Sequence, residues 1–325
     1  MSEREAAAKI RVETSVALDA HDLIRALEDN VCRVIHGKRD VVRLAVVSLL
    51  ARGHVLIEDV PGVGKTTLAH ALARSLGLSF QRIQFTSDLL PSDIIGVSVY
   101  DQQERRFRFT PGPLFAHVVL ADEINRATPK TQSALLEAMS EGWVSVDRDR
   151  HPLPRPFLVI ATQNPLEHEG TFPLPESQLD RFLMSLEVGY PAREHERELL
   201  MGGGIEAALD SLPPVLDEQL LQELQQRAAM VRVAEKLVDY MLEIADATRA
   251  SSELALGVSP RGLQGLYRAV QALAFCRGRD FATPDDVQEL APRVLGHRIV
   301  VRRGRDETSP RRIVRRIVRR VAVPV

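Results

Sequence analysis

The sequence predicts an α/β fold with a largely parallel sheet, followed by an all-helical domain. Short apolar runs typical of buried strands alternate with segments of helical periodicity. One of these strands enters a Pro-Gly loop that leads into a helix, and after Pro191 nearly every segment has helical periodicity. We therefore expect an α/β core over 21–190 and a helical lid over 191–303. A flexible N-terminus (1–20) and a basic amphipathic helix (304–325) complete the chain.

The composition is that of an ordinary globular protein, with 325 residues, a net charge of −2 and 45% hydrophobic residues. This balance gives no overall preference for nucleic acid or membranes. The charge is uneven, because residues 302–320 hold nine Arg against Asp306 and Glu307, or +7, which leaves −9 for the remainder. Without an N-terminal apolar run or a membrane-length apolar segment, we expect a cytoplasmic protein. Cys32 and Cys276 lie in apolar, helix-like stretches and are expected to be separate buried thiols.

The elements of the core follow in order. Apolar residues recur at helical spacing from Asp22 to about Leu50, and Gly37 divides this stretch into two helices. "HVLIED" is then a buried strand, and "TTLAHALARSLG" is a helix that ends at Gly77. "FQRIQFT", "HVVLADE" and "PFLVIATQNP" are three further strands, each bounded by turn residues.

Two stretches of the core alternate like β-hairpins. The first is "VSVYDQQERRFRFTPGP" (97–113), and the second is 142–160, whose return arm is expected to become the fourth strand of the sheet. Beyond the core, "TPDD" at 283–286 marks a helix start. The expected helices of the second domain are 192–202, 215–228, 234–250, 259–277 and 284–295.

The stretch "LIEDVPGVGKTTLA" matches the phosphate-loop pattern G-x-x-x-x-G-K-[ST] except at Asp59. Glycines let backbone N–H groups wrap a phosphate, Lys65 would reach the β- and γ-phosphates, and the Thr66 hydroxyl would bind Mg²⁺. The alternatives are a plain strand-to-helix turn with a surface Lys, or a dinucleotide fingerprint, which Thr67 disfavours because it occupies the third glycine position. The expected nucleotide-binding residues are Pro61, Gly62, Val63, Gly64, Lys65, Thr66 and Thr67.

Polar side chains at two other strand ends suit ATP hydrolysis. Asp122 would hold Mg²⁺ and Glu123 would polarise the attacking water, unless the two carboxylates only cap a helix or face solvent in a turn. Asn164 would orient water near the γ-phosphate, or would only start an Asn-Pro turn. Arg181 and Arg261 would stabilise the charge of phosphoryl transfer, or would be ordinary surface and ion-pairing residues.

The series "VPGVGKTT", "LADEINRA", "ATQNP", "EGTFPLPESQLDRF" and "GVSPRGL", in this order, resembles the MoxR family of AAA+ ATPases from about residue 25 to about 300. The resemblance implies a P-loop AAA+ core with a helix-2 insert and a pre-sensor-1 hairpin, fitting 97–113 and 142–160, and a helical lid. It implies these roles: Walker A at 59–66, Walker B ending at Asp122 and Glu123, sensor 1 at Asn164, an arginine finger at Arg181 and sensor 2 at Arg261.

Two further details come from the resemblance. Family members often carry an acidic residue before "VPG", so Asp59 fits the family. "VIHGKRD" resembles the segment that lines the adenine pocket, which brings Gly37 into the site, although Lys38 replaces the Gln often found there.

The implied activity is hydrolysis of ATP with Mg²⁺, used for chaperone-like remodelling or maturation of a client complex. If Arg181 acts in trans, the chain forms a homo-oligomeric ring, a hexamer by family precedent, in which each ATP lies between Lys65, Glu123 and Arg261 of one subunit and Arg181 of the next. The resemblance also implies a partner containing a von Willebrand factor A domain. The alternative is a DNA-acting AAA+ translocase that contacts phosphates through Arg105, Arg106 and Arg108, which the acidic core disfavours. A non-hydrolysing scaffold would require a damaged Glu123 or Arg181.

The C-terminal segment "SPRRIVRRIVRRVAVPV" predicts an amphipathic helix that starts at Ser309-Pro310. All six Arg of 311–320 lie on one face. We favour packing of the apolar stripe on the lid with the Arg side chains in solvent. The alternative is that the Arg face binds anionic lipid, nucleic acid or an acidic partner. The apolar stripe consists of Ile313, Val314, Ile317, Val318 and Val321.

Overall fold

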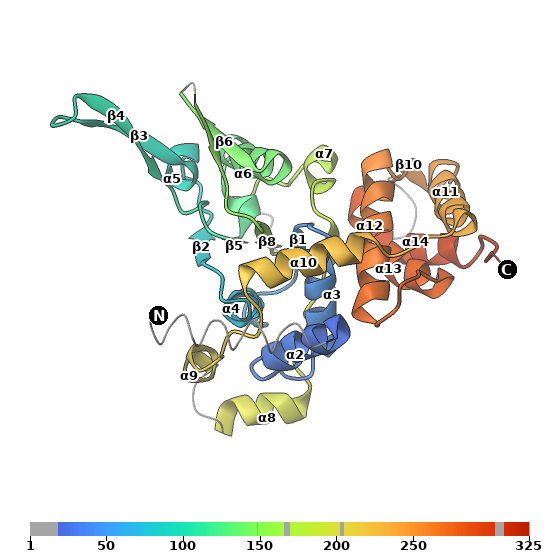
Figure 1. The fold of residues 1–325 in the computed structure, drawn as a ribbon. Coiled ribbons are helices and arrows are strands. Elements are labelled where there is room, and N and C mark those ends of the chain that lie inside the picture. The colour runs from blue at the N-terminus through green and yellow to red at the C-terminus, as the bar shows by residue number, and fades with distance from the viewer. Residues whose placement is uncertain (1–18, 148, 166–169, 202–204, 303–308, 325) are drawn as a thin grey trace.

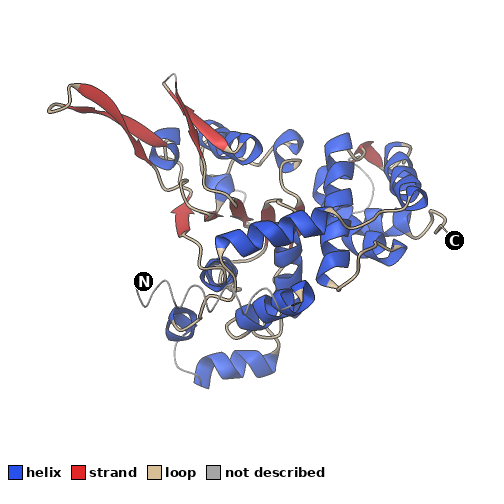
Figure 2. Cartoon of the chain, in the orientation of Figure 1, coloured by secondary structure: helices blue, strands red, loops and turns tan. Residues whose placement is uncertain are grey.

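A five-stranded parallel sheet forms the centre of the α/β part (Figures 1 and 2). The computed structural model describes residues 19–147, 149–165, 170–201, 205–302 and 309–324. The strand order is β2-β5-β8-β1-β9. The strands are β1 (Val55–Glu58), β2 (Phe80–Gln84), β5 (Val118–Asp122), β8 (Leu158–Gln163) and β9 (Met184–Leu186). The predicted flexible N-terminus, 1–20, falls almost entirely outside the described residues.

Helices cover both faces of this sheet, which explains why its central strands are uniformly apolar. Alternate residues of β5 point to opposite faces, so Val118 and Leu120 join one apolar core while Val119 and Ala121 join another. The first core includes α2 (Ala20–Cys32), α3 (Arg39–Leu50) and α4 (Lys65–Ser75). The second includes α5 (Pro91–Ile95) and α6 (Pro129–Glu141), which the sequence analysis did not identify as helices.

Both predicted hairpins are present and project beyond the sheet on the same side (Figure 1). The first pairs β3 (Gly96–Asp101) with β4 (Arg106–Pro111), and the second pairs β6 (Trp143–Val146) with β7 (Asp149–Pro152). The prediction that the return arm of the second hairpin becomes the fourth strand is wrong. That arm ends at Pro152 and β8 begins at Leu158, because three prolines between 152 and 156 lack the N–H that a continuous sheet strand needs.

The second half of the described chain is mainly helical, as predicted. Figure 1 shows α10 running across the core towards a group of helices formed by α11 to α14. Thr283 caps α13 in a capping box with Asp286, which confirms the helix start predicted there. The elements of this half that were not predicted from the sequence are α7, β9, α9 and the small β10–β11 pair. The elements are α7 (Glu176–Leu179), α8 (Arg193–Met201), α9 (Ile205–Asp210), α10 (Glu218–Ala229), α11 (Glu235–Arg249), β10 (Leu254–Leu256), α12 (Pro260–Cys276), α13 (Pro284–Leu295), β11 (Val300–Val301) and α14 (Pro310–Val318).

The C-terminal helix α14 packs on the lid through its apolar stripe, as favoured from the sequence. The expectation that its Arg side chains all stay in solvent is wrong for Arg311, because this side chain is only 19% exposed and pairs with Glu187. Ile313, Val314, Ile317 and Val318 are buried in the same core as α12 and α13. Cys32 and Cys276 are both free thiols, and Cys276 is buried as expected, whereas Cys32 is only partly buried. Among the described residues, no helix is long and apolar enough to span a membrane.

Candidate active site

The phosphate loop joins the carboxyl end of β1 to α4 in the geometry that its glycines predict. Gly62 and Gly64 have φ of +83° and +91°, a region that strongly favours glycine. No atom lies within 4 Å of a Cβ added at either position, so the space beside both glycines is open. Gly64 caps α4, whose first residue is Lys65. A loop of turned-in N–H groups at a helix N-terminus fits a phosphate.

Asp59, the departure from the loop pattern, fastens the loop to the segment that follows β9. Its Oδ2 accepts hydrogen bonds from the backbone N–H groups of Val188 (2.8 Å) and Gly189 (2.6 Å). Its Oδ1 accepts one from Val60 N (2.8 Å), and its carbonyl oxygen accepts one from Lys65 Nζ (2.7 Å). A glycine would have no side chain to make the first three bonds, so Asp59 fixes the position of the loop.

The segment around Gly37 lies against the same part of the chain. Lys38 Nζ donates to the carbonyl oxygen of Tyr190 (2.7 Å), next to the Gly189 that Asp59 binds. Gly37 has φ of +69°, and a Cβ there would come within 2.3 Å of His195 on α8. The structure therefore brings Gly37 and the phosphate loop to a common segment, 188–195, and gives Lys38 a structural bond.

Asp122 ends β5 with both carboxylate oxygens engaged. Its Oδ1 accepts from Thr162 Oγ1 (2.6 Å), and its Oδ2 accepts from Arg82 Nε (3.1 Å). Thr162 lies on β8 and Arg82 on β2, the two strands that flank β5. Neither residue was predicted from the sequence, because their contacts with Asp122 depend on the strand order.

Glu123 follows with its backbone in the left-handed region, at φ 56° and ψ 49°. Its N–H donates to Thr162 Oγ1 (2.9 Å), and its Oε2 accepts from Gln84 Nε2 (2.8 Å) and pairs with Arg126 Nε (3.2 Å). The side chain is one-quarter exposed. Gln84 and Arg126 thus hold the carboxylate that the sequence predicts to polarise water. The polar residues of "FQRIQFT" are the only feature of the sequence that could have indicated a role for Gln84.

Asn164 lies directly after β8 and is nearly buried. Because β1, β5 and β8 are parallel neighbours, their carboxyl ends bring the phosphate loop, the two acids and Asn164 to one edge of the sheet. Mg²⁺ prefers hard oxygen ligands and usually keeps waters and substrate phosphates as its other ligands. The Thr66 hydroxyl and the Asp122 carboxylate are oxygen donors of that kind, so the residues at this edge fit Mg²⁺ with ATP.

Arg181 lies at the opposite side of the sheet, where its parallel strands begin, which we call the amino edge. It precedes β9, and Leu183 N bonds to the carbonyl oxygen of His54, the residue just before β1 (2.7 Å). The Arg181 Nη1 donates to Leu136 O (2.6 Å) and Ser140 Oγ (2.9 Å) on α6. Its Nε is buried and has no hydrogen-bond partner in the part of the chain that the structure describes. The guanidinium therefore has an unused donor.

Arg261 lies on the segment that bonds to Asp180, the residue before Arg181. It is the second residue of α12, and the cap of that helix, Ser259, hydrogen-bonds to Asp180. Arg261 is exposed and has no hydrogen-bond or ion-pair partner among the described residues. Burial, and then the charge of Arg261, lower the pKa of Arg268, about two helical turns further on. The two arginines predicted from sequence thus share the amino edge of the sheet.

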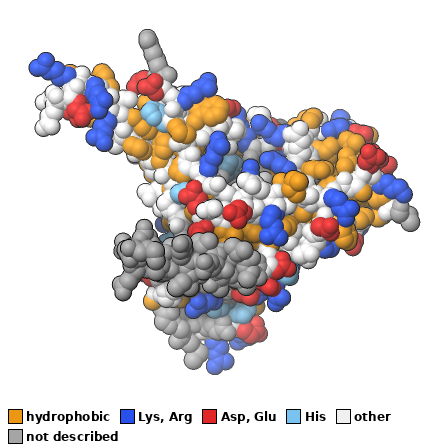
Figure 3. Space-filling model, in the orientation of Figure 1, with side chains coloured by type: hydrophobic (Ala, Val, Ile, Leu, Met, Phe, Trp, Pro, Cys, Tyr) orange, Lys and Arg blue, Asp and Glu red, His pale blue; other side chains and the backbone are white. Residues whose placement is uncertain are grey.

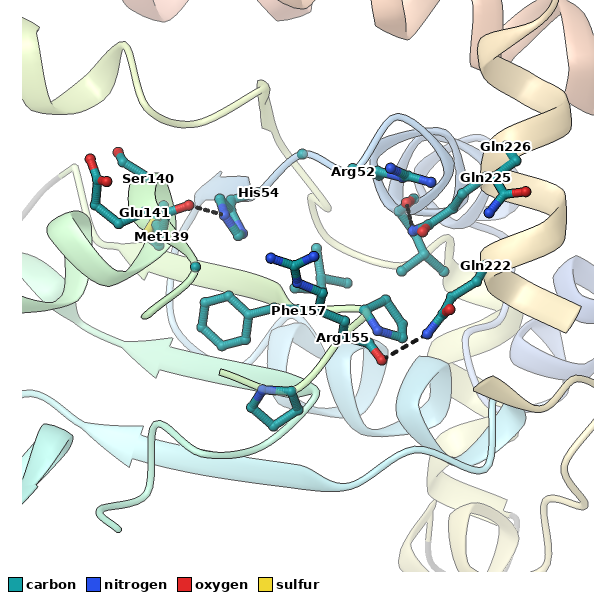
Figure 4. A pocket seen from close by; sticks show the side chains of 16 residues that line it. Arg52, His54, Met139, Ser140, Glu141, Arg155, Phe157, Gln222, Gln225 and Gln226 are labelled. Atoms are coloured by element: carbon teal, nitrogen blue, oxygen red, sulfur yellow. Dashed lines mark hydrogen bonds between the residues drawn. The ribbon is translucent and has the colours of Figure 1, made fainter. Parts of the chain in front are cut away.

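A hollow of about 540 Å³ also opens at this amino edge (Figure 4). It lies between the start of β1, the end of α6 and α10, and Gln222 of α10 donates to the carbonyl oxygen of Arg155 there (3.1 Å). Its floor holds His54, which accepts from Val159 N through Nδ1 and bonds Met139 O through Nε2. The hollow shares Ser140 with the anchor of Arg181, and it lies across the sheet from the phosphate loop.

Comparisons with known proteins identify relatives of this chain. The family described as "ATPase family associated with various cellular activities (AAA)" matches residues 54–184, and an AAA lid domain matches 246–317. YeaC of Bacillus subtilis (strain 168) is 48% identical over 94% of this chain and 97% of its own. Chaperone MoxR1 of Mycobacterium tuberculosis is 45% identical over 95% of this chain and 84% of its own. A crystal structure from Cytophaga hutchinsonii has a TM-score of 0.86 at 35% identity, covering 98% of this chain and 99% of that one.

Proposed function

The chain belongs to the MoxR family of AAA+ ATPases and hydrolyses ATP, and from this premise we propose that it works as a closed ring with shared active sites. Each ATP, with Mg²⁺, binds to the phosphate loop of one subunit and meets Arg181 and Arg261 of the next. A contact between unlike edges is heterologous and closes into a ring when its rotation allows, and we propose a hexamer. Hydrolysis then drives chaperone-like remodelling of a client protein complex.

The observation that carries this proposal is the separation of the catalytic groups within one subunit. Lys65, Glu123 and Asn164 lie at the carboxyl edge of the sheet, and Arg181 and Arg261 lie at its amino edge. A strand advances about 3.3 Å per residue, so the length of β1 alone sets these edges roughly 13 Å apart. One subunit therefore cannot bring its own arginines to its own γ-phosphate without large rearrangement, whereas a neighbour can.

This arrangement revises the role expected for Arg261 from the sequence, which was to serve the ATP of its own subunit. The link from Ser259 to Asp180 favours Arg181 and Arg261 acting on the same, neighbouring ATP. In each shared site, Lys65 and the N–H groups of the loop bind phosphate, and Glu123 accepts a proton from the attacking water. Thr66 and Asp122 hold Mg²⁺, which neutralises phosphate charge, and Asn164 orients the water.

The two hairpins are the surfaces that we propose for the client and for a partner with a von Willebrand factor A domain. Figure 3 shows Lys and Arg side chains gathered at the outer end of the β3–β4 hairpin. There Tyr100 and Phe107 pack edge to face with their ring centres 5.3 Å apart and remain half or more exposed. Exposed aromatic and basic side chains of this kind suit protein contacts.

The decisive experiment is ATP turnover per subunit measured across a wide range of protein concentration, with Glu123→Gln as the blank. Turnover should rise with concentration as subunits assemble. Mixing Lys65→Ala subunits, which keep their arginines, with Arg181→Ala subunits, which keep their loops, should restore turnover that neither variant has alone. Turnover that stays constant down to concentrations where only monomers exist, or a mixture with no activity, would contradict the shared site.

A further inference from the structure

A partly buried cluster joins the lid to the segment that carries Arg181. It consists of Asp180, Ser259 and Arg298, which we call the Asp180 clamp. Asp180 Oδ1 accepts from Arg298 Nε (2.8 Å), and both carboxylate oxygens lie 3.0 Å from Ser259 Oγ. These three residues come from the end of α7, the start of α12 and the turn after α13.

Burial and several hydrogen bonds fix the side chain of Arg298 within the clamp. Only 4% of this residue is exposed, and its guanidinium also donates to the carbonyl oxygens of Asp180 (3.3 Å), Phe182 and Leu183 (3.0 Å). Burial lowers the pKa of Arg298 to about 10, which leaves it charged at neutral pH and paired with Asp180. The Arg298 guanidinium thus bonds to Asp180, Phe182 and Leu183, the residues on either side of Arg181, and holds the backbone of that segment in one position.

The same clamp sets the position of α12. Ser259 caps this helix by accepting from Gly262 N (3.0 Å) while its hydroxyl proton goes to Asp180. A Cβ at Gly262 would come within 2.8 Å of Arg298 Cδ, so the helix approaches the guanidinium as closely as its glycine allows. The start of α12, where Arg261 lies, is therefore fixed relative to residue 180.

We propose that the Asp180 clamp positions Arg181 and Arg261 as one unit, so that both arginines reach the ATP of the neighbouring subunit together. The inference rests on the shared site proposed above and adds positioning residues to it. Each guanidinium must meet phosphate oxygens to within fractions of an ångström, and misplacement by about 1 Å can cost 10²-fold in rate. Asp180, Ser259 and Arg298 touch no substrate and act only through the two arginines.

Ser259 allows a clean test, because two substitutions of equal size separate its two bonds. Both Asp and Asn cap helices well, so Ser259→Asp and Ser259→Asn should each keep the bond from Gly262 N. Asn can still donate to Asp180, whereas Asp cannot donate and repels that carboxylate. We expect Ser259→Asp to lower kcat about 10- to 10²-fold and Ser259→Asn to retain most of it. ATP affinity, measured with Glu123→Gln added to both variants, should match the parent.

Mixing variant subunits distinguishes a positioning role of Ser259 from a general loss of stability. A subunit that is merely unstable would not regain turnover when a second variant is added. Ser259→Asp subunits keep an intact phosphate loop, so added Lys65→Ala subunits, which keep an intact clamp and both arginines, should restore turnover. Wild-type kcat in Ser259→Asp would overturn the clamp, and so would equal losses in Asp and Asn variants or weakened ATP binding. If the mixture of Arg181→Ala and Lys65→Ala works while the Ser259→Asp mixture does not, the shared site stands and the clamp fails. If neither mixture regains turnover, the shared site is contradicted, and so is the clamp, because it rests on the shared site.

Discussion

The two edges of the sheet that carry the catalytic groups are built in different ways. At the carboxyl edge, the phosphate loop is open, and an added Cβ at Gly62 or Gly64 would meet nothing within 4 Å. At the amino edge, Arg298 is 4% exposed and bonds to Asp180, 118 residues away in the chain. The phosphate loop of the first edge is formed by one continuous strand, loop and helix, whereas the contacts of Asp180 at the second edge join three distant segments.

This difference matches what each edge must do. The phosphate loop must admit and release a nucleotide, and its binding groups are backbone N–H groups that need space in front of them. The arginines must be presented to another subunit at a fixed angle, and long side chains lose rotamer freedom only when their surroundings hold them. Openness at one edge and burial at the other therefore suit a site assembled from two subunits.

The largest effect is expected when the amino edge loses its arginine. Arg181→Ala should reduce kcat about 10³–10⁵-fold, because an arginine supplied to phosphoryl transfer contributes that much, while ATP binding at the loop persists. Arg181→Lys should also be strongly impaired, since an ammonium lacks the guanidinium fork. Turnover and ATP binding measured on the same preparations check this. A loss of less than tenfold in Arg181→Ala would show that the two edges do not share a site.

The second prediction concerns the burial that distinguishes the amino edge. Arg298→Met should lower the free energy of unfolding by about 3–5 kcal/mol, because removing one partner of a buried ion pair leaves Asp180 uncompensated. Arg232→Met is the matched control, because Arg232 pairs with Asp280 where both side chains are more than three-quarters exposed. That change should cost about 0–1 kcal/mol in denaturant unfolding. Equal losses for the two variants would refute the difference in burial.

The sequence predicted the open edge far better than the buried one. Residues 61–67 are contiguous, so their spacing alone predicts a loop with two left-handed glycines and a helix behind it. Asp122, Glu123 and Asn164 each follow an apolar strand, and parallel strands bring such ends together. Asp180 gave no signal, because its partners Ser259 and Arg298 are 79 and 118 residues away.

The elements and contacts that were not predicted from the sequence share related physical reasons. β9 is three residues long, which is too short for periodicity to distinguish a strand from a turn. It is nevertheless the outermost strand of the sheet, beside β1, and α13 of the lid packs against it. Gln84 and Thr162 were missed because contact with the two acids requires β2 and β8 to flank β5. The end of β7 at Pro152 was missed because the apolar run beyond it resembled a continuation.

The third prediction uses the hollow at the amino edge. Burial lowers the pKa of His54 to about 4, against 6.5 for an exposed histidine, so the folded state favours neutral His54. Its contribution to stability is complete above pH 6.5 and is lost as the pH falls towards 4, by about 2 kcal/mol at pH 5. His54→Gln keeps one acceptor and one donor for Val159 and Met139 but does not titrate. Unfolding free energies of both proteins between pH 5 and 7.5 should converge at low pH, and parallel curves would contradict the prediction.

The smallest change in stability is expected for a substitution at the open carboxyl edge. A matched pair of variants there separates backbone strain from loss of ATP binding. Gly64→Ala and Gly142→Ala both place a Cβ at positive φ, +91° and +73°, with no atom nearby to clash. Each should therefore lose about 1–2 kcal/mol of stability from backbone strain alone. Only Gly64 faces the space proposed for phosphate, so only Gly64→Ala should weaken ATP binding in calorimetric titration. If the two variants bind ATP equally well, the space at Gly64 is not where the phosphates lie, and the carboxyl edge loses the feature that sets it apart from an ordinary helix start.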